Sequence, residues 1–262
     1  MTSDSNDQRP LLLEIARCPR LLQQFEEPSL RQECSALINC QAPLSRETHQ
    51  APEPWSGDLQ TSRILFFGSN PSINTAEQFP TLAWPDEDIE DFFSRRFGRG
   101  RRPWVDARLR VLLVDGTHGK RSSSVRFWAA CRARATEILG RAARPGVDFA
   151  ISEVVHCKSK GESENGRAIT RLATPVCSER YTMRIIRASA AKVVCLMGDV
   201  PGAEFRRLLN AEKAVRFLGP LNVQAQERYF VFLDHPAGRG SVKTIAAALS
   251  AEQIALICEA AR

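Results

Sequence analysis

Apolar residues in this chain occur in two kinds of pattern: short unbroken runs, and longer stretches in which they recur every three or four positions. The short runs are rich in β-branched and aromatic residues and stop at Gly, Pro or polar residues, which is typical of buried strands. Four runs have this form: Ile64–Phe67, Val147–Val155, Lys192–Met197 and Tyr229–Leu233. The helical spacing predicts helices over Ile89–Phe97, Val125–Arg141, Glu179–Ser189, Gly202–Asn210 and Val242–Ala261.

Strands that alternate with helices predict an α/β fold. We expect a central, mainly parallel sheet of about four strands between two helical layers, a three-layer α/β/α arrangement. Because crossover connections are right-handed, the carboxyl ends of these strands would lie at one edge of the sheet, where ligands bind. The polar loops expected to meet there are Gly68–Asn74, His156–Lys160 and Asp234–Gly240.

The first 58 residues follow a different pattern. Leu11–Cys40 has a helical spacing that breaks near Pro28, which predicts two helices, and Gln41–Asp58 is a polar, Pro-rich connector. We therefore divide the chain into an N-terminal helical extension with its connector, residues 1–58, and an α/β domain, residues 59–262.

The composition agrees with a globular protein, since 43% of the 262 residues are hydrophobic and 25% are charged. The formal net charge of +6 suits a polyanionic partner such as nucleic acid, although many proteins are this basic without binding one. One arginine-rich stretch could either grip DNA phosphates or simply face solvent. Its arginines are Arg95, Arg96, Arg99, Arg101 and Arg102.

No stretch of the sequence resembles a signal peptide or a membrane span, so we expect a cytoplasmic protein, and we expect a monomer. The compartment also affects how the 8 cysteines are interpreted. Under reducing conditions, cysteines are more often buried thiols or metal ligands than disulfides.

The loop after the first strand carries candidate chemistry. Gly68 lets the backbone approach a ligand closely, Pro71 stiffens the turn, and the amide of Asn70 can both donate and accept hydrogen bonds. A strand-ending turn without any chemistry would have the same sequence features, so this loop alone leaves both alternatives open.

In their order along the chain, several motifs resemble those of the uracil-DNA glycosylase superfamily. Gly68-Ser69-Asn70-Pro71 resembles the Gly-x-Asn-Pro motif of the mismatch-specific and single-strand-selective branches, and His235-Pro236 resembles the His-Pro-Ser motif. Val154-Val155-His156-Cys157-Lys158 is similar to the Asn-Val-Val-Lys-Cys segment of the iron–sulfur branches. Cys18-Pro19-Arg20-Leu21-Leu22 resembles the Cys-Pro-Arg-Leu-Val start of one of them. The resemblance extends from Arg63 to the C-terminus, with this short N-terminal segment in addition.

The resemblance implies a monofunctional DNA glycosylase of base-excision repair. Such an enzyme hydrolyses the N-glycosidic bond of a flipped-out deaminated base, here uracil in the first instance, and leaves an abasic site in damaged DNA. Asn70 would orient the attacking water and His235 would stabilise the leaving base, and neither step requires a metal. Gly68, Ser69 and Pro71 would line the base pocket. Without the resemblance, His235 would equally suit a helix cap or a core position.

The resemblance also assigns residues to DNA binding and to the flipped base. Arg239 is the only large side chain in the loop after the His-Pro pair and would enter the minor groove or pair with a phosphate. Phe79, with Trp84 as the alternative, would stack on the base, although both could be ordinary core aromatics. The residues expected to bind DNA are Arg239, Gly238, Ser241, Lys158, Arg101 and Arg102.

The chain departs from the superfamily in the second strand, where many members place an Asn that reads uracil and this chain has Glu153. A carboxylate accepts from a ring N–H but cannot donate to the neighbouring carbonyl unless it is protonated. The base therefore stays open between uracil read by backbone groups and another deaminated base such as hypoxanthine or xanthine. Ser72 and Ala237 also replace a Gly and a Ser of the family motifs.

The iron–sulfur members of the superfamily use an N-terminal Cys pair and two later cysteines. Cys157 and Cys177 occupy the places of the later pair, and Cys18 would need Cys34 or Cys40 to complete the set. Four thiolates are required to hold a 4Fe-4S cluster. Such a cluster, held by Cys18, Cys34, Cys157 and Cys177, is one alternative, and four buried thiols are the other.

Two other classes of function fit parts of the sequence. A nucleotide-binding α/β enzyme would use the first loop to hold phosphate, but that loop lacks the Gly-x-Gly-x-x-Gly and Gly-Lys-Ser/Thr motifs. A non-catalytic nucleic-acid-binding member of the same fold would bind DNA and leave no abasic product.

Overall fold

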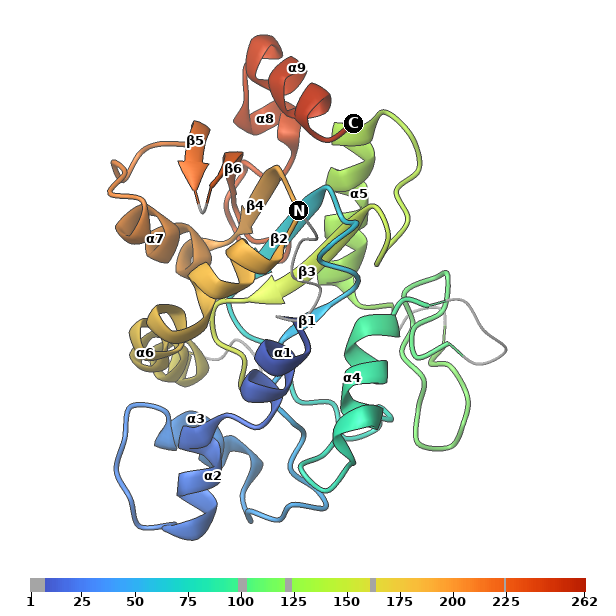
Figure 1. Cartoon of the computed structure of the whole chain (residues 1–262), viewed down its shortest axis with the longest axis vertical. Coiled ribbons are helices and arrows are strands. Elements are labelled where there is room, and N and C mark those ends of the chain that lie inside the picture. Colours follow the sequence, from blue (N-terminus) through green and yellow to red (C-terminus); the bar gives the residue numbers. More distant parts are fainter. Residues whose placement is uncertain (1–7, 99–102, 121–123, 161–163, 224) are drawn as a thin grey trace.

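One sheet forms the centre of the computed structural model, which describes residues 8–98, 103–120, 124–160, 164–223 and 225–262 (Figure 1). Its strands are β1 (Trp55–Ser56), β2 (Ile64–Gly68), β3 (Phe149–Glu153), β4 (Val193–Met197), β5 (Phe217–Val223) and β6 (Gln226–Leu233). They lie in the order β1-β3-β2-β4-β6-β5. The four inner strands are parallel, whereas β1 pairs antiparallel with β3 and β5 pairs antiparallel with β6.

The fold is therefore mixed α/β, and the expectation of about four strands is correct only for the parallel centre. The whole sheet has six strands and is mixed. The two outer strands escape the sequence pattern for different reasons. β1 has only two residues and lies inside the predicted connector. β5 is mostly half-buried, and the Gly219-Pro220 pair interrupts its apolar run.

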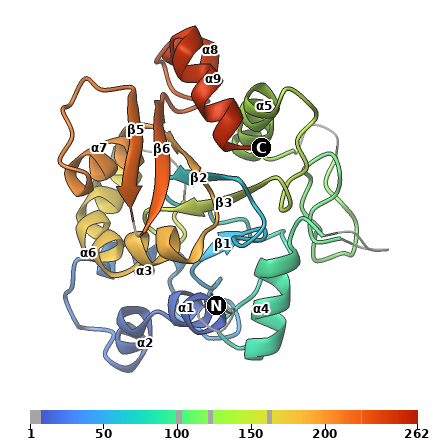
Figure 2. The same ribbon diagram turned by 45° about the horizontal axis from the view of Figure 1, so that its top comes forward.

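Helices cover both faces of the sheet, because alternate residues of each central strand point to opposite sides. In β2, Leu65 and Phe67 pack with α1, α4, α6 and α7, and Ile64 and Phe66 pack with α5, α8 and α9. In Figure 2, α5, α8 and α9 lie above the strands and α1 and α4 lie below them. The helices are α1 (Gln8–Ala16), α2 (Pro19–Glu26), α3 (Ser35–Ile38), the 3-10 helix η1 (Asn39–Gln41), α4 (Asp86–Arg95), α5 (Arg126–Leu139), α6 (Glu164–Ala188), α7 (Asp199–Leu208), α8 (Ile245–Ala248) and α9 (Ala251–Ala260).

Two helices differ from the sequence prediction. α6 begins at Glu164, well before the predicted start at Glu179, and continues through Pro175. An internal proline usually ends a helix because it lacks an N–H and crowds the preceding turn, so Pro175 weakens the sequence signal for a helix that passes through it. The predicted closing helix is instead two helices, because Ser250 starts α9 with a capping box that includes Gln253.

The N-terminal segment is part of the same packed body. Leu11, Leu12 and Ile15 of α1 are buried in the core that covers one face of the sheet. α3 lies beside α6, and α2 packs against α3 (Figure 1). Both helices share a smaller apolar cluster with Val155 and Cys157, which follow β3. The first 58 residues therefore contribute a strand and part of the core to the body that the remaining residues form. Among the described helices, none is both long enough and apolar enough to cross a membrane.

Candidate active site

A large cleft opens where β2 and β3 end, with a volume of about 910 Å³. All three loops that the sequence predicts at this edge contribute to its lining, and so do residues of α5 and α6. The loop residues are Gly68, Ser69, Asn70, Pro71, Ser72 and Asn74, then Lys158 and Ser159, and then Asp234, His235, Ala237, Gly238, Arg239 and Gly240. The cleft thus brings together the two residues predicted to carry the chemistry, Asn70 and His235.

Three neighbours fix the side chain of Asn70. Its Nδ2 donates to Ser159 Oγ at 2.8 Å and to the Pro71 carbonyl at 3.2 Å. Its Oδ1 accepts from the Thr170 hydroxyl at 3.1 Å. Because an amide oxygen has two lone pairs, Oδ1 keeps the capacity to accept a further hydrogen bond. Backbone bonds between Ser159 and the Pro71–Ile73 segment hold the two loops together beneath this side chain.

His235 is held by an aromatic ring and by its own loop. Phe127 of α5 stacks on the imidazole, with ring centroids 5.8 Å apart and planes inclined by 14°. The Ala237 N–H donates to Nδ1 at 3.3 Å, so a neutral ring in this position carries its proton on Nε2. A Cβ atom at Gly198, after β4, would lie 3.2 Å from the Cβ of His235, so a glycine suits the backbone behind the ring.

Asp234 closes the loop that follows β6. Its Oδ1 pairs with Arg216 at 2.9 Å, and its Oδ2 accepts from the Val242 N–H at 2.9 Å. Partial burial raises the pKa of Asp234, but the Val242 and Arg216 contacts outweigh it and hold the pKa below its ordinary value. These contacts hold the start of the loop in place, and the loop carries Arg239, an exposed residue of the cleft lining. Ser241, also predicted to bind DNA, is exposed on the same loop.

Glu153, the last residue of β3, is a buried part of the cleft lining. Its Oε2 has no hydrogen-bond partner within the described part of the chain. Burial, with a smaller contribution from Glu53, raises the pKa of Glu153 well above its ordinary value, although Arg96 and Lys158 oppose the shift. The sequence predicted a base-binding role for this residue, and the structure brings it to the same cleft as Asn70 and His235.

Arg96 is a buried part of the cleft wall. It forms ion pairs with Glu53 and, at 2.6 Å, with Glu77. Its guanidinium carbon lies 4.6 Å from the ring centroid of Trp128 and 5.1 Å from those of Phe79 and Phe92. These contacts remove Arg96 from the proposed phosphate grip, because its side chain is 2% exposed.

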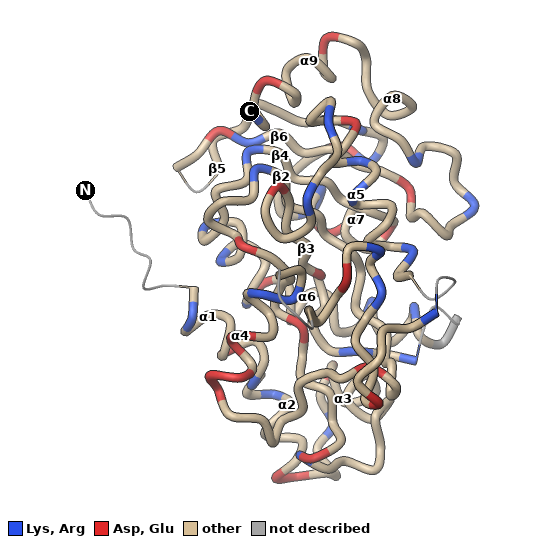
Figure 3. Tube along the Cα trace, turned by 90° about the vertical axis from the view of Figure 1, so that its right-hand side faces the viewer, with Lys and Arg blue, Asp and Glu red and all other residues tan. Residues whose placement is uncertain are grey.

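The remaining arginines of that stretch fall into two groups. Arg95 is exposed and pairs with Asp91, four residues before it, at 3.0 Å. Arg99, Arg101 and Arg102 lie outside the described residues, so their assignment to DNA stays a prediction. Lys and Arg positions occur in many separate segments along the described chain (Figure 3).

Lys158, predicted to lie at the edge of the pocket and to assist DNA binding, is part of the cleft lining. It is buried, and its Nζ lies 3.3 Å from the centroid of the Phe79 ring. Burial lowers the pKa of Lys158 to about 8. A lysine in this position lines the cleft from within instead of extending toward solvent, where a duplex backbone would run.

The two aromatics predicted to stack on the base lie in the core. Phe79 packs edge-on against Phe92 and Phe93, and Trp84 packs against Phe92 and Trp104. Neither is part of the cleft lining. Both therefore have the positions of core aromatics, the alternative to base stacking that the sequence left open.

Several residues that line the cleft escape the sequence analysis. Phe127 and Trp128 begin α5, where their spacing suggested only a core-facing helix. Gly166, Arg167, Thr170 and Arg171 belong to the first turns of α6, a region for which the sequence predicted no helix. Arg167 and Arg171 are exposed and lie four residues apart, on the same face of α6. Once α6 is known to start at Glu164, the i, i+4 spacing of these two arginines predicts that they lie side by side.

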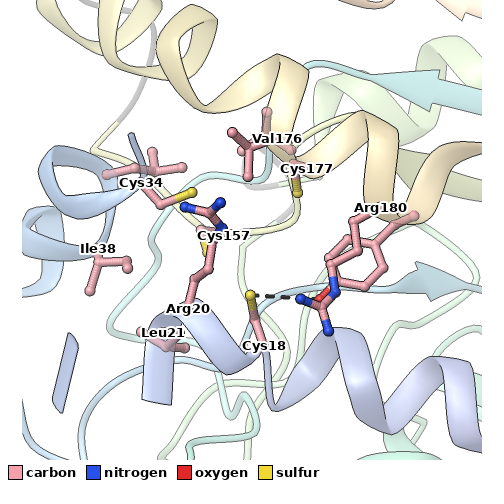
Figure 4. Close-up of a pocket in the computed structure, with 12 residues that line it drawn as sticks. Cys18, Arg20, Leu21, Cys34, Ile38, Cys157, Val176, Cys177 and Arg180 are labelled. Carbon is pink, nitrogen blue, oxygen red and sulfur yellow. Dashed lines mark hydrogen bonds between the residues drawn. The ribbon is translucent and has the colours of Figure 1, made fainter. Parts of the chain in front are cut away.

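A second, much smaller pocket contains the four cysteines proposed for a cluster (Figure 4). Its volume is about 20 Å³. Cys18 precedes α2, Cys34 precedes α3, Cys157 follows β3 and Cys177 lies in α6. Cys40, the other candidate, is not part of this lining. We call this site the cysteine pocket.

The cysteine pocket is apolar apart from its thiols and the side chains of Arg20, Arg180 and Tyr181. Burial raises the pKa of Cys34 to about 11 and that of Cys157 well above its ordinary value. The Tyr181 hydroxyl donates to Cys18 Sγ at 3.7 Å. Within the described ranges, no group of three or more His, Cys, Asp or Glu side chains is arranged to hold a metal ion as it stands.

Comparisons with known proteins do not identify a family for this chain. No family model matches the chain, and no curated protein matches it either.

Proposed function

We propose that this protein is a DNA glycosylase of the uracil-DNA glycosylase superfamily. It would hydrolyse the N-glycosidic bond of a flipped-out deaminated base and leave an abasic site. The observation that carries the proposal is the common cleft of Asn70 and His235, two side chains from loops far apart in the sequence. Its volume of about 910 Å³ lies within the usual size range of small-molecule sites, roughly 300–1,000 Å³, and accommodates one nucleobase with its sugar.

The proposed reaction assigns one task to each residue. As the bond between C1′ and the base nitrogen breaks, its electron pair moves to the base, and His235 donates a hydrogen bond from Nε2 to the base oxygen that becomes negative. A water held by Asn70 Oδ1 adds to C1′, and its proton passes to solvent. An amide is a poor base, so Asn70 acts by orienting the water. The base leaves as an anion and takes a proton from solvent.

Exposed cations near the cleft support a nucleic-acid substrate. Arg167 and Arg171 line it from α6, and Arg239 lines it from the loop after β6. The three arginines come from two elements, which suits contacts to more than one phosphate. The helical layers on both faces of the sheet also suit the three-layer α/β/α arrangement that the resemblance implies.

The cysteine pocket suits a 4Fe-4S cluster, which we include in the proposal. Its potential donors are all thiols, Cys18, Cys34, Cys157 and Cys177, and its remaining wall is largely apolar. A cavity of about 20 Å³ holds little more than one water, so the thiols would have to move outward around a cluster. When bound, the cluster would link α2, α3 and α6 to the segment after β3. The proposed hydrolysis does not use it.

Iron, sulfide and the visible spectrum of anaerobically purified protein test the cluster. Cys34→Ser should lower the iron content, whereas Cys40→Ser should keep it, because Cys40 is the half-buried neighbour outside the pocket. Equal iron content in both variants, or none in the wild type, would remove the cluster from the proposal and leave the glycosylase assignment unaffected.

The glycosylase assignment is tested by incubating DNA that carries uracil, hypoxanthine or xanthine with the protein and then cleaving abasic sites with alkali. Asn70→Ala and His235→Ala should each reduce the rate by about 10²- to 10³-fold, the usual loss when one electrostatic contact to a transition state is removed. Asn222→Ala, at an exposed position of β5, is the matched control and should keep the wild-type rate. Tight DNA binding without any abasic product would instead favour the non-catalytic alternative.

A further inference from the structure

Glu153 occupies an unusual position between two strands. It pairs in register with Gly68 of β2, and its side chain lies across that glycine. A Cβ atom placed on Gly68 would lie only 2.1 Å from Glu153 Oε2. The absent side chain of Gly68 therefore creates the space that the carboxyl group fills, directly beneath the loop that carries Asn70.

The carboxyl group is also short of partners. Glu153 is 7% exposed, and its Oε2 lacks a hydrogen-bond partner among the residues that the structure describes. An unpaired buried polar atom is costly, and native structures retain one mainly where it serves a function. This atom lies in the lining of a cleft that is large enough for a ligand, so a ligand can supply the missing partner.

The surrounding charges are balanced without Glu153. The cations nearby are Arg96, at the end of α4, and Lys158, after β3. The carboxylates of Glu53 and Glu77 already offset them, and Arg96 is ion-paired with both. Cys131 of α5 also faces Glu153 and is held as a neutral thiol, because burial raises its pKa well above the ordinary value. A negative charge on Glu153 would therefore add an unbalanced buried charge to this group.

We propose that Glu153 is a neutral carboxylic acid and that it reads the flipped base through one donated and one accepted hydrogen bond. This inference rests on the proposed glycosylase function. The acid's O–H would donate to an exocyclic carbonyl of the base, and its C=O would accept from the adjacent ring N–H. That pair of groups is the lactam edge, which uracil, hypoxanthine and xanthine share. The substrate class is thus deaminated bases in general.

A neutral carboxylic acid can form both hydrogen bonds to a lactam edge, whereas an ionised glutamate cannot. The carboxylate has only acceptors and would repel the carbonyl of a lactam edge. The acid also fits the amino edge of cytosine or adenine, since its proton can sit on either oxygen. Discrimination against undamaged bases would then come from groups of the cleft other than Glu153.

The test compares excision of uracil and hypoxanthine by the wild type, Glu153→Gln and Glu153→Leu over a range of pH. Gln keeps a donor beside an acceptor and should retain activity within about tenfold, whereas Leu should lose about 10- to 100-fold in kcat/KM. The wild type should lose activity as alkaline pH ionises Glu153, and Gln should lack that decline. Wild-type kcat/KM in the Leu variant would overturn the inference, and so would an identical alkaline decline in the Gln variant.

Two measurements that do not depend on activity separate this inference from the glycosylase proposal. Infrared spectra at neutral pH should contain the carbonyl band of a protonated carboxylic acid that disappears in Glu153→Gln. Because the folded pKa is raised, the wild type should lose stability relative to Gln as pH rises above the unfolded value of about 4.3. A carboxylate band alone would refute the neutral acid even in an active enzyme. A protonated band in a protein that excises no base would refute base reading together with the glycosylase assignment.

Discussion

The cleft and the cysteine pocket share one short segment of their walls, residues 153–159, and differ in size and in charge. Glu153, Lys158 and Ser159 line the cleft, whereas Val155 and Cys157, which lie between them in sequence, line the cysteine pocket. The cleft is large and contains buried charges. The pocket is small, and burial raises the pKa of its Cys34, Cys157 and Cys177 thiols.

One segment thus contributes charged and polar residues to the cleft and a thiol to the cysteine pocket. Buried charges in the cleft wall are kept in place by ion pairs, so they stay available to a polar ligand. In the cysteine pocket, the lining arginines Arg20 and Arg180 form ion pairs that are open to solvent. The thiols themselves pack among apolar side chains, with one hydrogen bond from Tyr181 to Cys18. We therefore expect substitutions at the two sites to act through different forces.

The largest effect should follow loss of the cation in the cleft wall. Arg96→Met would leave Glu53 and Glu77 buried without their partner, which should lower the free energy of unfolding by about 3–5 kcal/mol. Urea unfolding measures this loss. Arg95→Met is the matched control, because its side chain is 77% exposed, and it should change stability by no more than about 0.5 kcal/mol. Similar stabilities for the two variants would contradict a role for the buried ion pairs.

The second effect concerns the thiols. Burial raises the pKa of Cys34 to about 11 from an ordinary 9.0, so at neutral pH its thiolate should be about 100-fold scarcer than that of an unperturbed thiol. In protein stripped of iron, pulsed alkylation read by mass spectrometry should therefore modify Cys40 long before Cys34. Equal rates would mean that the cysteine pocket opens readily, and the contrast with the cleft would then be lost.

A third effect links the two strands beneath the cleft. Gly68→Ala should force the Glu153 side chain aside and cost about 1–3 kcal/mol through overpacking. Glu153→Ala in the same chain removes the obstructing atoms, so the double variant should be more stable than the sum of the single changes predicts. Additive losses in urea unfolding would show that the glycine serves another purpose.

The parallel centre of the fold could be predicted because its four strands carry strong local signals. Each is a short apolar run ended by polar or turn-forming residues, as Ile64–Phe67 before Gly68 shows. The edge strands could not be predicted, since pairing with a neighbour defines β1 more than its own two residues do. The first half of α6 could not be predicted, because Pro175 is locally unfavourable inside a helix. In the structure, packing along the rest of α6 outweighs this local effect.

In the candidate site, too, residues in local sequence motifs could be predicted, whereas those that depend on tertiary packing could not. Asn70, His235 and Glu153 could be chosen from sequence because the segments around them resemble motifs of the glycosylase superfamily. All three end strands or follow them closely, and the structure places them in one cleft. The burial of Phe79 and Lys158 could not be predicted, because it depends on the packing of α4. Phe92 of α4 packs on Phe79, and the Phe79 ring in turn contacts Lys158. The four cysteines are an intermediate case. The sequence proposed the set, and the choice of Cys34 over Cys40 required the spatial arrangement.

The smallest effect concerns the exposed arginines of the cleft. Arg167→Ala and Arg171→Ala should weaken DNA binding equally for damaged and undamaged sequences, because phosphate contacts carry no sequence information. Neither change should alter stability by more than about 0.5 kcal/mol. Arg31→Ala, an exposed arginine outside the cleft lining, is the control and should bind as the wild type does.

Salt dependence makes this effect specific to the cleft. Each phosphate contact that is lost should reduce the slope of log affinity against log salt by about 0.9 on duplex DNA and about 0.7 on single strands. Removing both α6 arginines should therefore reduce the duplex slope by nearly two, even where the affinity at low salt changes little. Arg101→Ala and Arg102→Ala extend the same measurement to the predicted loop. A slope that stays unchanged in the α6 variants would place the backbone grip elsewhere, and a change in the loop variants would assign it to that loop.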